Sequence, residues 1–236
     1  MTSDNATTAT PTEAATPTEA ATPTEAGTTT TGTATTATAA GHGIADGAGG
    51  DAPLRLVVII GSTRTGRFSP VAAAWFADEV RKHHGFDVDV VDLQGMDLPD
   101  SLDGTADTEA LGLRLAAADA FVVVTPEYNH SYPAPLKAAI DHFHAEWLAK
   151  PVGFVTYGGM SGGLRAVEHL RGVFAELHAV TVRDTISFYN YPNRFGDDGV
   201  PHDAASAGEA AKGMLGQLLW WGRALRDARA VRPYGG

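Results

Sequence analysis

The chain has 236 residues, no Cys, and a formal net charge of -11 that arises from 28 acidic and 17 basic residues. The absence of Cys excludes disulfides, thiol nucleophiles and Cys-based metal sites, and it fits the reducing cytoplasm, where we expect the protein to reside. The acidic balance argues against a nucleic-acid surface, and no apolar run approaches the roughly 20 residues that cross a membrane. We therefore expect neither nucleic acid nor a membrane as a partner.

Residues 1–50 differ in composition from the rest of the chain. They contain no Lys or Arg and five of the acidic residues, which leaves residues 51–236 with a net charge of -6. A Thr-Pro-Thr-Glu-Ala unit repeats three times from Thr10, and large apolar residues are almost absent. Such a tract buries too little surface to offset chain entropy, so we predict a disordered tail over residues 1–50 and one folded domain over residues 51–236. A mucin-like stalk is the alternative, but the chain start lacks the basic and apolar regions of a secretory signal.

Five short apolar runs alternate with segments of helical period, and this alternation is typical of a doubly wound parallel α/β sheet. The expected strands are residues 54–60, 88–91, 121–124, 152–156 and 180–186. The expected helices are residues 70–84, 108–118, 133–147, 164–177 and 209–230. Five βα units match a flavodoxin-like sheet of strand order 2-1-3-4-5 as well as a truncated Rossmann fold, so topology alone leaves both open.

The first polar loop, residues 61–69, reads Gly-Ser-Thr-Arg-Thr-Gly-Arg-Phe-Ser. Amides at a helix start, hydroxyl donors and bidentate arginines all suit phosphate, so this loop predicts a phosphate site. The loop nearly matches G-x-x-x-x-G-K-[ST], but Arg67 and Phe68 replace Lys and Ser or Thr, which argues against an ATPase or kinase. The G-x-G-x-x-G fingerprint also fails, and we interpret Asp92 as a turn-capping residue rather than the ribose-binding acid of NAD enzymes. The candidate ligands here are Ser62, Thr63, Arg64, Arg67 and Ser69.

The second polar loop follows the expected strand 121–124, and we expect Pro126 to end the pairing of that strand. Ser131 and Pro133 suit the start of the next helix, with Ser131 as its expected cap. Capping does not require the Glu-Tyr-Asn sequence at residues 127–129. An aromatic ring with amide and carboxylate neighbours instead suits a flat heteroaromatic ligand. The candidate ligands in this loop are Pro126, Glu127, Tyr128, Asn129 and Ser131.

The third polar loop, residues 157–163, contains four glycines, which allow the backbone to approach a ligand closely. A flexible turn in which Ser161 caps the next helix is an equally good interpretation of this loop taken alone. The loop also matches G-x-S-x-G, which leaves a serine hydrolase acting through Ser161 as a weaker alternative. The candidate ligands are Tyr157, Gly158, Gly159 and Ser161.

All three loops follow strand ends at the same edge of the predicted sheet, which favours one shared ligand. A phosphate at the first loop and a flat ring between the other two is the arrangement of FMN in flavodoxins.

Three motifs resemble those of the NADPH-dependent FMN reductase family over about residues 54–188: Gly-Ser-Thr-Arg-x-Gly-Arg, Thr-Pro-Glu-Tyr-Asn-x-Ser-x-Pro-x-x-Leu-Lys-x-Ala-Ile-Asp and Tyr-Gly-Gly-x-Ser-Gly-Gly. The resemblance implies a flavodoxin-like fold, bound FMN and a homodimer or homotetramer. It also implies hydride transfer from NADPH through FMN to a flavin, quinone, azo dye or metal oxyanion. On this resemblance Ser62, Arg64 and Ser69 hold the phosphate, and residues 126–129 and 158–161 line the isoalloxazine. Many members have Ser and Asn late in the first loop, where this chain has Arg67 and Ser69.

We therefore expect an oxidoreductase that uses FMN and NADPH and needs neither a metal nor a dedicated catalytic acid or base, since the cofactor carries the chemistry. A flavodoxin-like electron carrier without turnover of its own is the alternative. His142 and His144 stand two apart on an expected helix and point to different faces, which does not suit a zinc pair. Trp220 and Trp221 are expected in core and interface packing.

Overall fold

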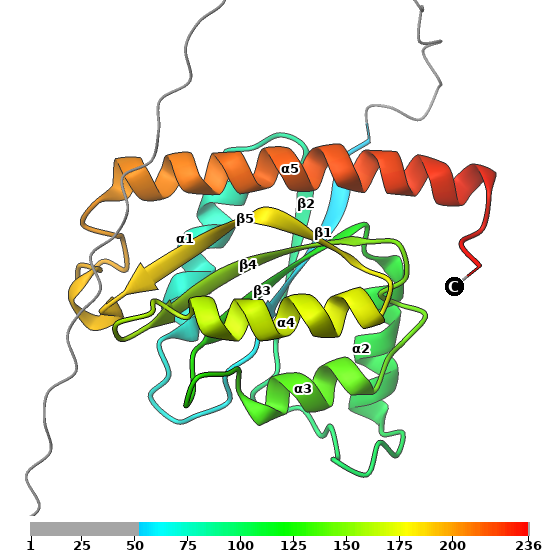
Figure 1. The fold of residues 1–236 in the computed structure, drawn as a ribbon, viewed down its shortest axis with the longest axis horizontal. Helices are drawn as coiled ribbons and strands as arrows, with labels where there is room; N and C mark the ends of the chain where they lie inside the picture. The colour runs from blue at the N-terminus through cyan, green and yellow to red at the C-terminus, as the bar shows by residue number, and fades with distance from the viewer. Residues whose placement is uncertain (1–51, 236) are drawn as a thin grey trace, which may run out of the picture. The chain divides into compact units, whose positions relative to one another are not determined.

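The computed structural model describes residues 52–235, and the tail predicted over residues 1–50 lies outside the described residues. The strands of the described part are β1 (Leu54–Ile60), β2 (Phe86–Asp92), β3 (Ala120–Pro126), β4 (Pro151–Gly158) and β5 (Val180–Tyr189). They form one parallel sheet in the order β2-β1-β3-β4-β5 (Figure 1). The predicted flavodoxin-like strand order is therefore confirmed.

Helices cover both faces of this sheet. They are α1 (Ser69–Arg81), α2 (Ala106–Ala117), α3 (Ala134–Asp141), α4 (Leu164–Glu176) and α5 (Ala204–Val231), with a short 3-10 turn at Tyr191–Asn193. α1 and α5 pack on one face, and α2, α3 and α4 pack on the other, since their buried side chains belong to two separate apolar clusters. Figure 1 shows α4 and α5 on opposite sides of the sheet.

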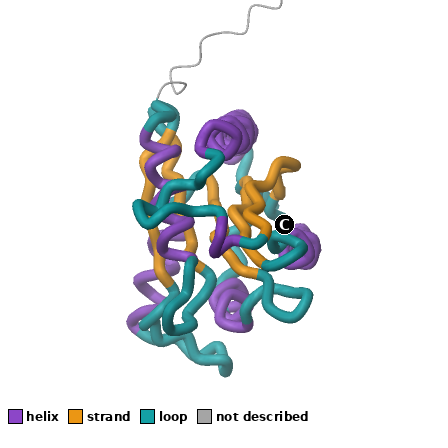
Figure 2. The backbone as a smooth tube through the Cα atoms, turned by 90° about the vertical axis from the view of Figure 1, so that its left-hand side faces the viewer, coloured by secondary structure: helices purple, strands orange, loops and turns teal. Residues whose placement is uncertain are grey.

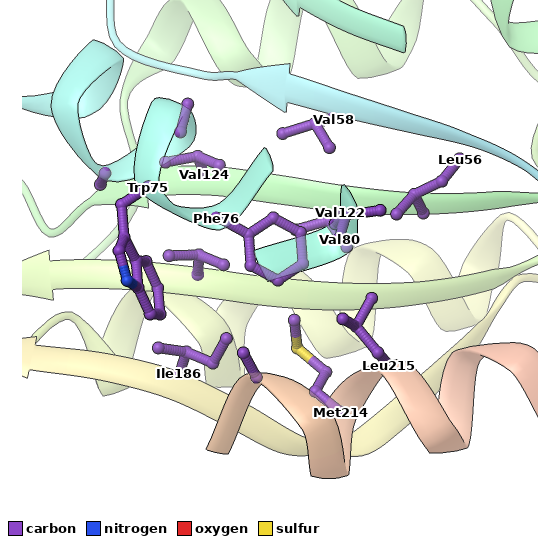
Figure 3. Close-up of a cluster of buried hydrophobic side chains, with 14 of the residues drawn as sticks. Leu56, Val58, Trp75, Phe76, Val80, Val122, Val124, Ile186, Met214 and Leu215 are labelled. Atoms are coloured by element: carbon purple, nitrogen blue, oxygen red, sulfur yellow. The ribbon is translucent and has the colours of Figure 1, made fainter. Parts of the chain in front are cut away.

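The two apolar clusters hold the central strands in place. On the α1 and α5 face, Phe76 of α1 and Met214 and Leu215 of α5 pack on Val58 and Val122 of the central strands (Figure 3). β3 and β4 are buried along their whole lengths. Their sequences lack apolar-polar alternation because both of their faces are covered. Buried strands of this kind fix the points at which the following loops leave the sheet.

The third helix is shorter than predicted, since α3 ends at Asp141 rather than at Trp147. The Trp147 ring is buried, and its centroid lies 4.7 Å from that of Phe121 and 5.4 Å from that of Phe174. Its indole N–H donates to the carbonyl oxygen of Ile140 at 3.3 Å, an acceptor that the next helical turn would have used. Burial of this large ring therefore prevails over continuation of the helix.

β3 ends at Pro126, as expected: its last pair with β4 is Pro126–Tyr157, and its ladder with β1 stops earlier, at Val124. A proline lacks the amide donor and is accommodated where one neighbouring strand has already ended.

Two other expectations are wrong. Trp220 and Trp221 are 64% and 36% exposed on α5, so they are not core residues, and their packing at an interface stays a prediction. His142 and His144 follow α3 instead of lying on it.

Candidate functional site

Three loops leave the carboxyl ends of the strands at one edge of the sheet: residues 61–68 after β1, 127–133 after β3 and 159–163 after β4. In Figure 1 the arrowheads of β4 and β5 point towards this edge, on the left, and Figure 2 looks onto it. In open α/β sheets, ligands bind outside this edge.

Hydrogen bonds join these loops into one unit. Ser62 Oγ and Tyr128 OH lie 2.8 Å apart, which ties the first loop to the second. Glu127 N donates to Tyr157 O of β4 at 3.1 Å, and Ser161 Oγ donates to Glu127 Oε2 at 2.6 Å, so the second loop is tied both to β4 and to the third loop. The structure thus brings together the three loops that the sequence singled out.

The first loop presents a row of unused backbone donors. The amides of residues 62–66 donate to no group among residues 52–235. Arg64 is exposed beside them, and its guanidinium carbon lies 5.9 Å from the centroid of the Tyr128 ring. Amides that gather at a loop before a helix, next to a cation, form a concavity suited to an anion.

Arg67, at the end of the first loop, adds a buried cation to this candidate anion site. One of its terminal nitrogens, Nη2, donates to Asp92 Oδ2, and the Arg67 side chain is 9% exposed. Its Nε is buried and has no hydrogen-bond partner in the described part of the chain. A buried cationic donor without an acceptor is costly, so the residues present fit a ligand oxygen such as that of a phosphate. Asp92 Oδ1 also accepts from Gln94 N at 3.0 Å, which confirms its interpretation as a turn-capping residue.

Ser62, Ser69 and Tyr157 are predicted ligands whose side chains lie inside the domain. They are 0%, 0% and 2% exposed, and Ser69 Oγ lies 2.5 Å from Tyr157 OH. Burial raises the pKa of Tyr157 to about 12, against the smaller opposing effect of the Ser69 hydrogen bond. The phenol therefore stays protonated at neutral pH. These three side chains hold the loops from within the domain.

The second loop is a tight turn that projects Asn129. Tyr128 N donates to Ser131 O at 2.8 Å, and Ser131 N donates to Tyr128 O at 3.0 Å. Asn129 and His130 have φ angles of 48° and 75°, in the left-handed region that Asn tolerates better than most residues. Ser131 does not cap α3 as predicted, because α3 has no side-chain cap and Ser131 Oγ lies 3.0 Å from His169 Nδ1 instead.

Glu127 anchors the third loop, and its side chain is 7% exposed. Its Oε2 accepts from Ser161 Oγ at 2.6 Å and from Arg165 N at 3.2 Å, while Oε1 pairs with Arg165 Nε at 2.7 Å. Ser161 is not the N-cap of α4, a position that Gly163 occupies with a φ of 90°. The amides of residues 159–161 donate to no group in the described structure, so this loop offers a second set of backbone donors.

The arrangement around Ser161 is not that of a serine hydrolase. Its hydroxyl donates to the carboxylate of Glu127, which the Arg165 guanidinium already neutralises. A serine nucleophile instead needs a base, usually an imidazole, that a third group orients. Within residues 52–235, no group of three or more His, Asp or Glu residues is placed to hold a metal ion. No helix in that range is both long and apolar enough to cross a bilayer.

Sequence reasoning missed Arg165 and His169, which lie on the first two turns of α4. Both contact the second loop, with Arg165 N on Glu127 and His169 Nδ1 beside Ser131. Each pair is separated by 38 residues in the chain. Nothing local in the sequence marks these pairings, because they depend on how α4 docks beside the loop after β3.

The fold and site define a flavodoxin-like protein with unused backbone donors in two loops at the carboxyl edge of its sheet. The chain belongs to the NADPH-dependent FMN reductase family, which matches residues 54–192. The predicted family is therefore confirmed.

Individual relatives agree with this assignment. The chain is 39% identical over 122 residues to an NAD(P)H-dependent FMN reductase of Schizosaccharomyces pombe, which is 46% of this chain and 60% of that protein. It is 34% identical over 166 residues to a probable NADPH:quinone oxidoreductase of Oryza sativa, which is 64% of this chain and 83% of that protein. The solved structure of FerB, a flavoenzyme NAD(P)H:(acceptor) oxidoreductase of Paracoccus denitrificans, shares the fold with a TM-score of 0.60 at 20% identity, over 72% of this chain and 98% of that chain.

Proposed function

We propose that the chain is an FMN-dependent oxidoreductase that takes hydride from NADPH and passes it through bound FMN to a small-molecule acceptor. This proposal rests on the unused hydrogen-bond donors of the first loop. They are the amides of residues 62–66, the exposed Arg64 and the buried Nε of Arg67, which has no partner in the described part of the chain. A phosphate would satisfy all of them, and FMN is the phosphorylated ligand that the family description names.

The proposed ligand set is the one predicted from the sequence, and burial divides its roles. In the first loop, backbone amides and the Arg64 and Arg67 side chains face the phosphate, while buried hydroxyls hold the loop from within. The ring would lie between the second and third loops. The complete set is Ser62, Thr63, Arg64, Arg67, Ser69, Pro126, Glu127, Tyr128, Asn129, Ser131, Tyr157, Gly158, Gly159 and Ser161.

Bound FMN supplies hydride transfer between NADPH and the acceptor. The amides of residues 159–161 would stabilise negative charge at the ring edge, since preorganised donors act strongly where water is excluded. No side chain is required as acid or base, which agrees with a protonated Tyr157 and with a Glu127 carboxylate bound to Arg165. NADPH and the acceptor would use one open face in turn, so we expect ping-pong kinetics.

A quinone, an azo compound or a free flavin is the proposed acceptor. Relatives with such names include the Oryza sativa protein and an FMN-dependent NADPH-azoreductase of Staphylococcus haemolyticus, 30% identical over 157 residues. A homodimer or homotetramer is also proposed, in which the exposed Trp220 and Trp221, with ring centroids 4.9 Å apart, would be covered. The proposed location is the cytoplasm, where NADPH is regenerated.

Spectroscopy on protein loaded with FMN tests the proposal. We expect a yellow protein that NADPH bleaches in the absence of oxygen and that turns over steadily when a quinone is added. An electron carrier would give no such steady turnover.

Variants test the ligand assignment. Arg64→Ala should weaken FMN binding about tenfold, because a charge-assisted phosphate contact contributes about 1.5 kcal/mol. Arg183→Ala removes a cation that is 92% exposed on β5 and is the matched control. Unchanged FMN affinity in both Arg64→Ala and Asn129→Ala would refute the assignment.

A further inference from the structure

Three side chains that can donate hydrogen bonds to an anion gather beside the proposed ring site. His130 of the second loop and Arg165 and His169 of α4 are all exposed, and together they are named the edge cluster. The cluster contacts the second loop, one of the two that would flank the ring, through Glu127 and Ser131. Such a grouping is notable in a domain whose residues 51–236 have a net charge of -6.

Arg165 is held firmly yet keeps a free donor. Its Nε pairs with Glu127 Oε1 at 2.7 Å, and its Nη1 donates to His130 Nδ1 at 3.0 Å. Its Nη2 has no partner among residues 52–235. A guanidinium can only donate, so His130 Nδ1 must accept, and the ring proton of His130 lies on Nε2. Arg165 and His130 thus each keep a donor for a ligand.

His169 supplies a second imidazole to the cluster. Its Nδ1 lies 3.0 Å from Ser131 Oγ, and its ring centroid lies 6.2 Å from that of His130. The hydrogen bonds of His130 and His169 thus hold both rings by their Nδ1 atoms, which leaves the Nε2 atoms for a ligand.

One neighbouring acid, Glu127, pairs with the cluster, and it does so from the buried side. Glu127 is 7% exposed and is shared between Arg165 and Ser161, so it does not reach the cluster's outer surface. Glu168, which lies on the same helix between Arg165 and His169, pairs with Arg171 at 3.2 Å. The outer side of the edge cluster therefore favours an anion.

We propose that the edge cluster binds the 2′-phosphate of NADPH and so selects NADPH over NADH; this inference rests on the proposed function. The 2′-phosphate is the group that distinguishes the two nucleotides. It is a phosphate monoester, and guanidinium and imidazole donors bind that group with charge-assisted hydrogen bonds. The cluster is built on the second loop, which is proposed to flank the ring, so a nucleotide bound at the ring would lie beside it.

Titration of the FMN-loaded protein with 2′,5′-ADP and with 5′-AMP tests the site without turnover, because the two fragments differ only in the 2′-phosphate. Wild type should bind 2′,5′-ADP about tenfold more tightly, the effect of one charge-assisted contact. The double variant His130→Gln/His169→Gln should lose most of this difference while it keeps the Glu127–Arg165 pair. His84→Gln removes an exposed histidine beyond α1 and is the matched control.

Steady-state kinetics add a second readout. In the double variant the KM for NADPH should rise about tenfold, and the KM for NADH should change by less than about twofold. Equal affinity of wild type for the two fragments, or an equal rise of both KM values in the variant, would overturn the proposal.

One further arm separates the nucleotide from an anionic acceptor. The KM for a sulfonated azo dye is measured with NADH as donor in wild type and in the double variant. If this KM rises in the variant while the affinity for 2′,5′-ADP is unchanged, the cluster binds the acceptor and the proposal is overturned. Failure of NADPH to reduce bound FMN would refute the proposed function. The fragment titration would still report on the phosphate site.

Discussion

Gly163 is the position where one added methyl group should damage the site most. It starts α4 with a φ of 90°, and a Cβ built on it would lie 1.8 Å from Thr156 Oγ1 and 2.9 Å from Thr156 Cβ. The left-handed conformation costs an alanine about 1 kcal/mol, and overpacking of a buried site costs about 1–3 kcal/mol more. We therefore expect Gly163→Ala to lower the free energy of unfolding by about 2–4 kcal/mol.

The same substitution should weaken FMN binding, because relief of the clash must move either β4 or the third loop. Thr156 Oγ1 donates to Thr125 O at 3.0 Å, so a shift of β4 would break a buried hydrogen bond. A shift of the loop would instead displace the unused amides of residues 159–161. Urea denaturation measures the stability, and titration with FMN measures the binding.

Gly172→Ala is the matched control, since it makes the same chemical change on the exposed side of α4, where nothing lies within 4 Å of the added Cβ. Alanine is the better helix former, so this variant should gain about 0.5–1 kcal/mol. Thr156→Ala removes the hydroxyl that clashes and should recover part of the loss in the double variant with Gly163→Ala. If Gly163→Ala were as stable as Gly172→Ala, the argument from close packing at the third loop would fail.

Three other perturbations probe the interior of the domain. Glu127→Gln should lower the free energy of unfolding by about 1–3 kcal/mol and weaken FMN binding, because Arg165 and Ser161 lose a charged acceptor; denaturation and FMN titration measure both. Tyr157→Phe should cost about 1–2 kcal/mol, because Ser69 Oγ is left buried without its partner. Addition of Ser69→Ala should return part of that cost, and a loss that simply adds would contradict the reasoning. Burial lowers the pKa of Lys150 to about 8 in the folded state. Between pH 8 and the unperturbed pKa of 10.5 the unfolded state therefore binds more protons than the folded state, and the free energy of unfolding should rise with pH across this window. The rise should be at most about 2 kcal/mol after allowance for solvent screening, and it should be missing in Lys150→Met when the two proteins are compared by denaturation at pH 7.5 and pH 10.

The sheet was predictable because its signals are local. The uninterrupted apolar run at residues 121–124 can only be buried on both faces, and the structure buries β3 completely. The end of α3 was not predictable, because it depends on the packing of Trp147 against Phe121 and Phe174, which are distant in the sequence. Local propensity places elements, whereas tertiary burial decides where they stop.

In the site, the residue types could be predicted from the sequence, but their hydrogen-bond partners could not. The sequence singled out Ser69 as part of the first polar loop and Tyr157 as part of the Gly-rich third loop, and the structure brings their hydroxyls within 2.5 Å of each other. It pairs their hydroxyls with each other instead of exposing them to a ligand. A polar residue at a strand end indicates that a partner is needed, but the identity of the partner depends on the docking of other elements.

Glu127 links the two binding functions proposed for this edge. One carboxylate holds both Ser161, in the loop proposed to contact the ring, and Arg165, in the edge cluster proposed to contact the nucleotide phosphate. Any shift of Arg165 towards a bound phosphate would therefore act on the ring loop through a single buried group. We expect Glu127→Gln to reduce FMN affinity and the preference for NADPH together, whereas His130→Gln/His169→Gln should reduce the preference alone. Loss of the preference in Glu127→Gln with unchanged FMN affinity would show that the two sites are independent.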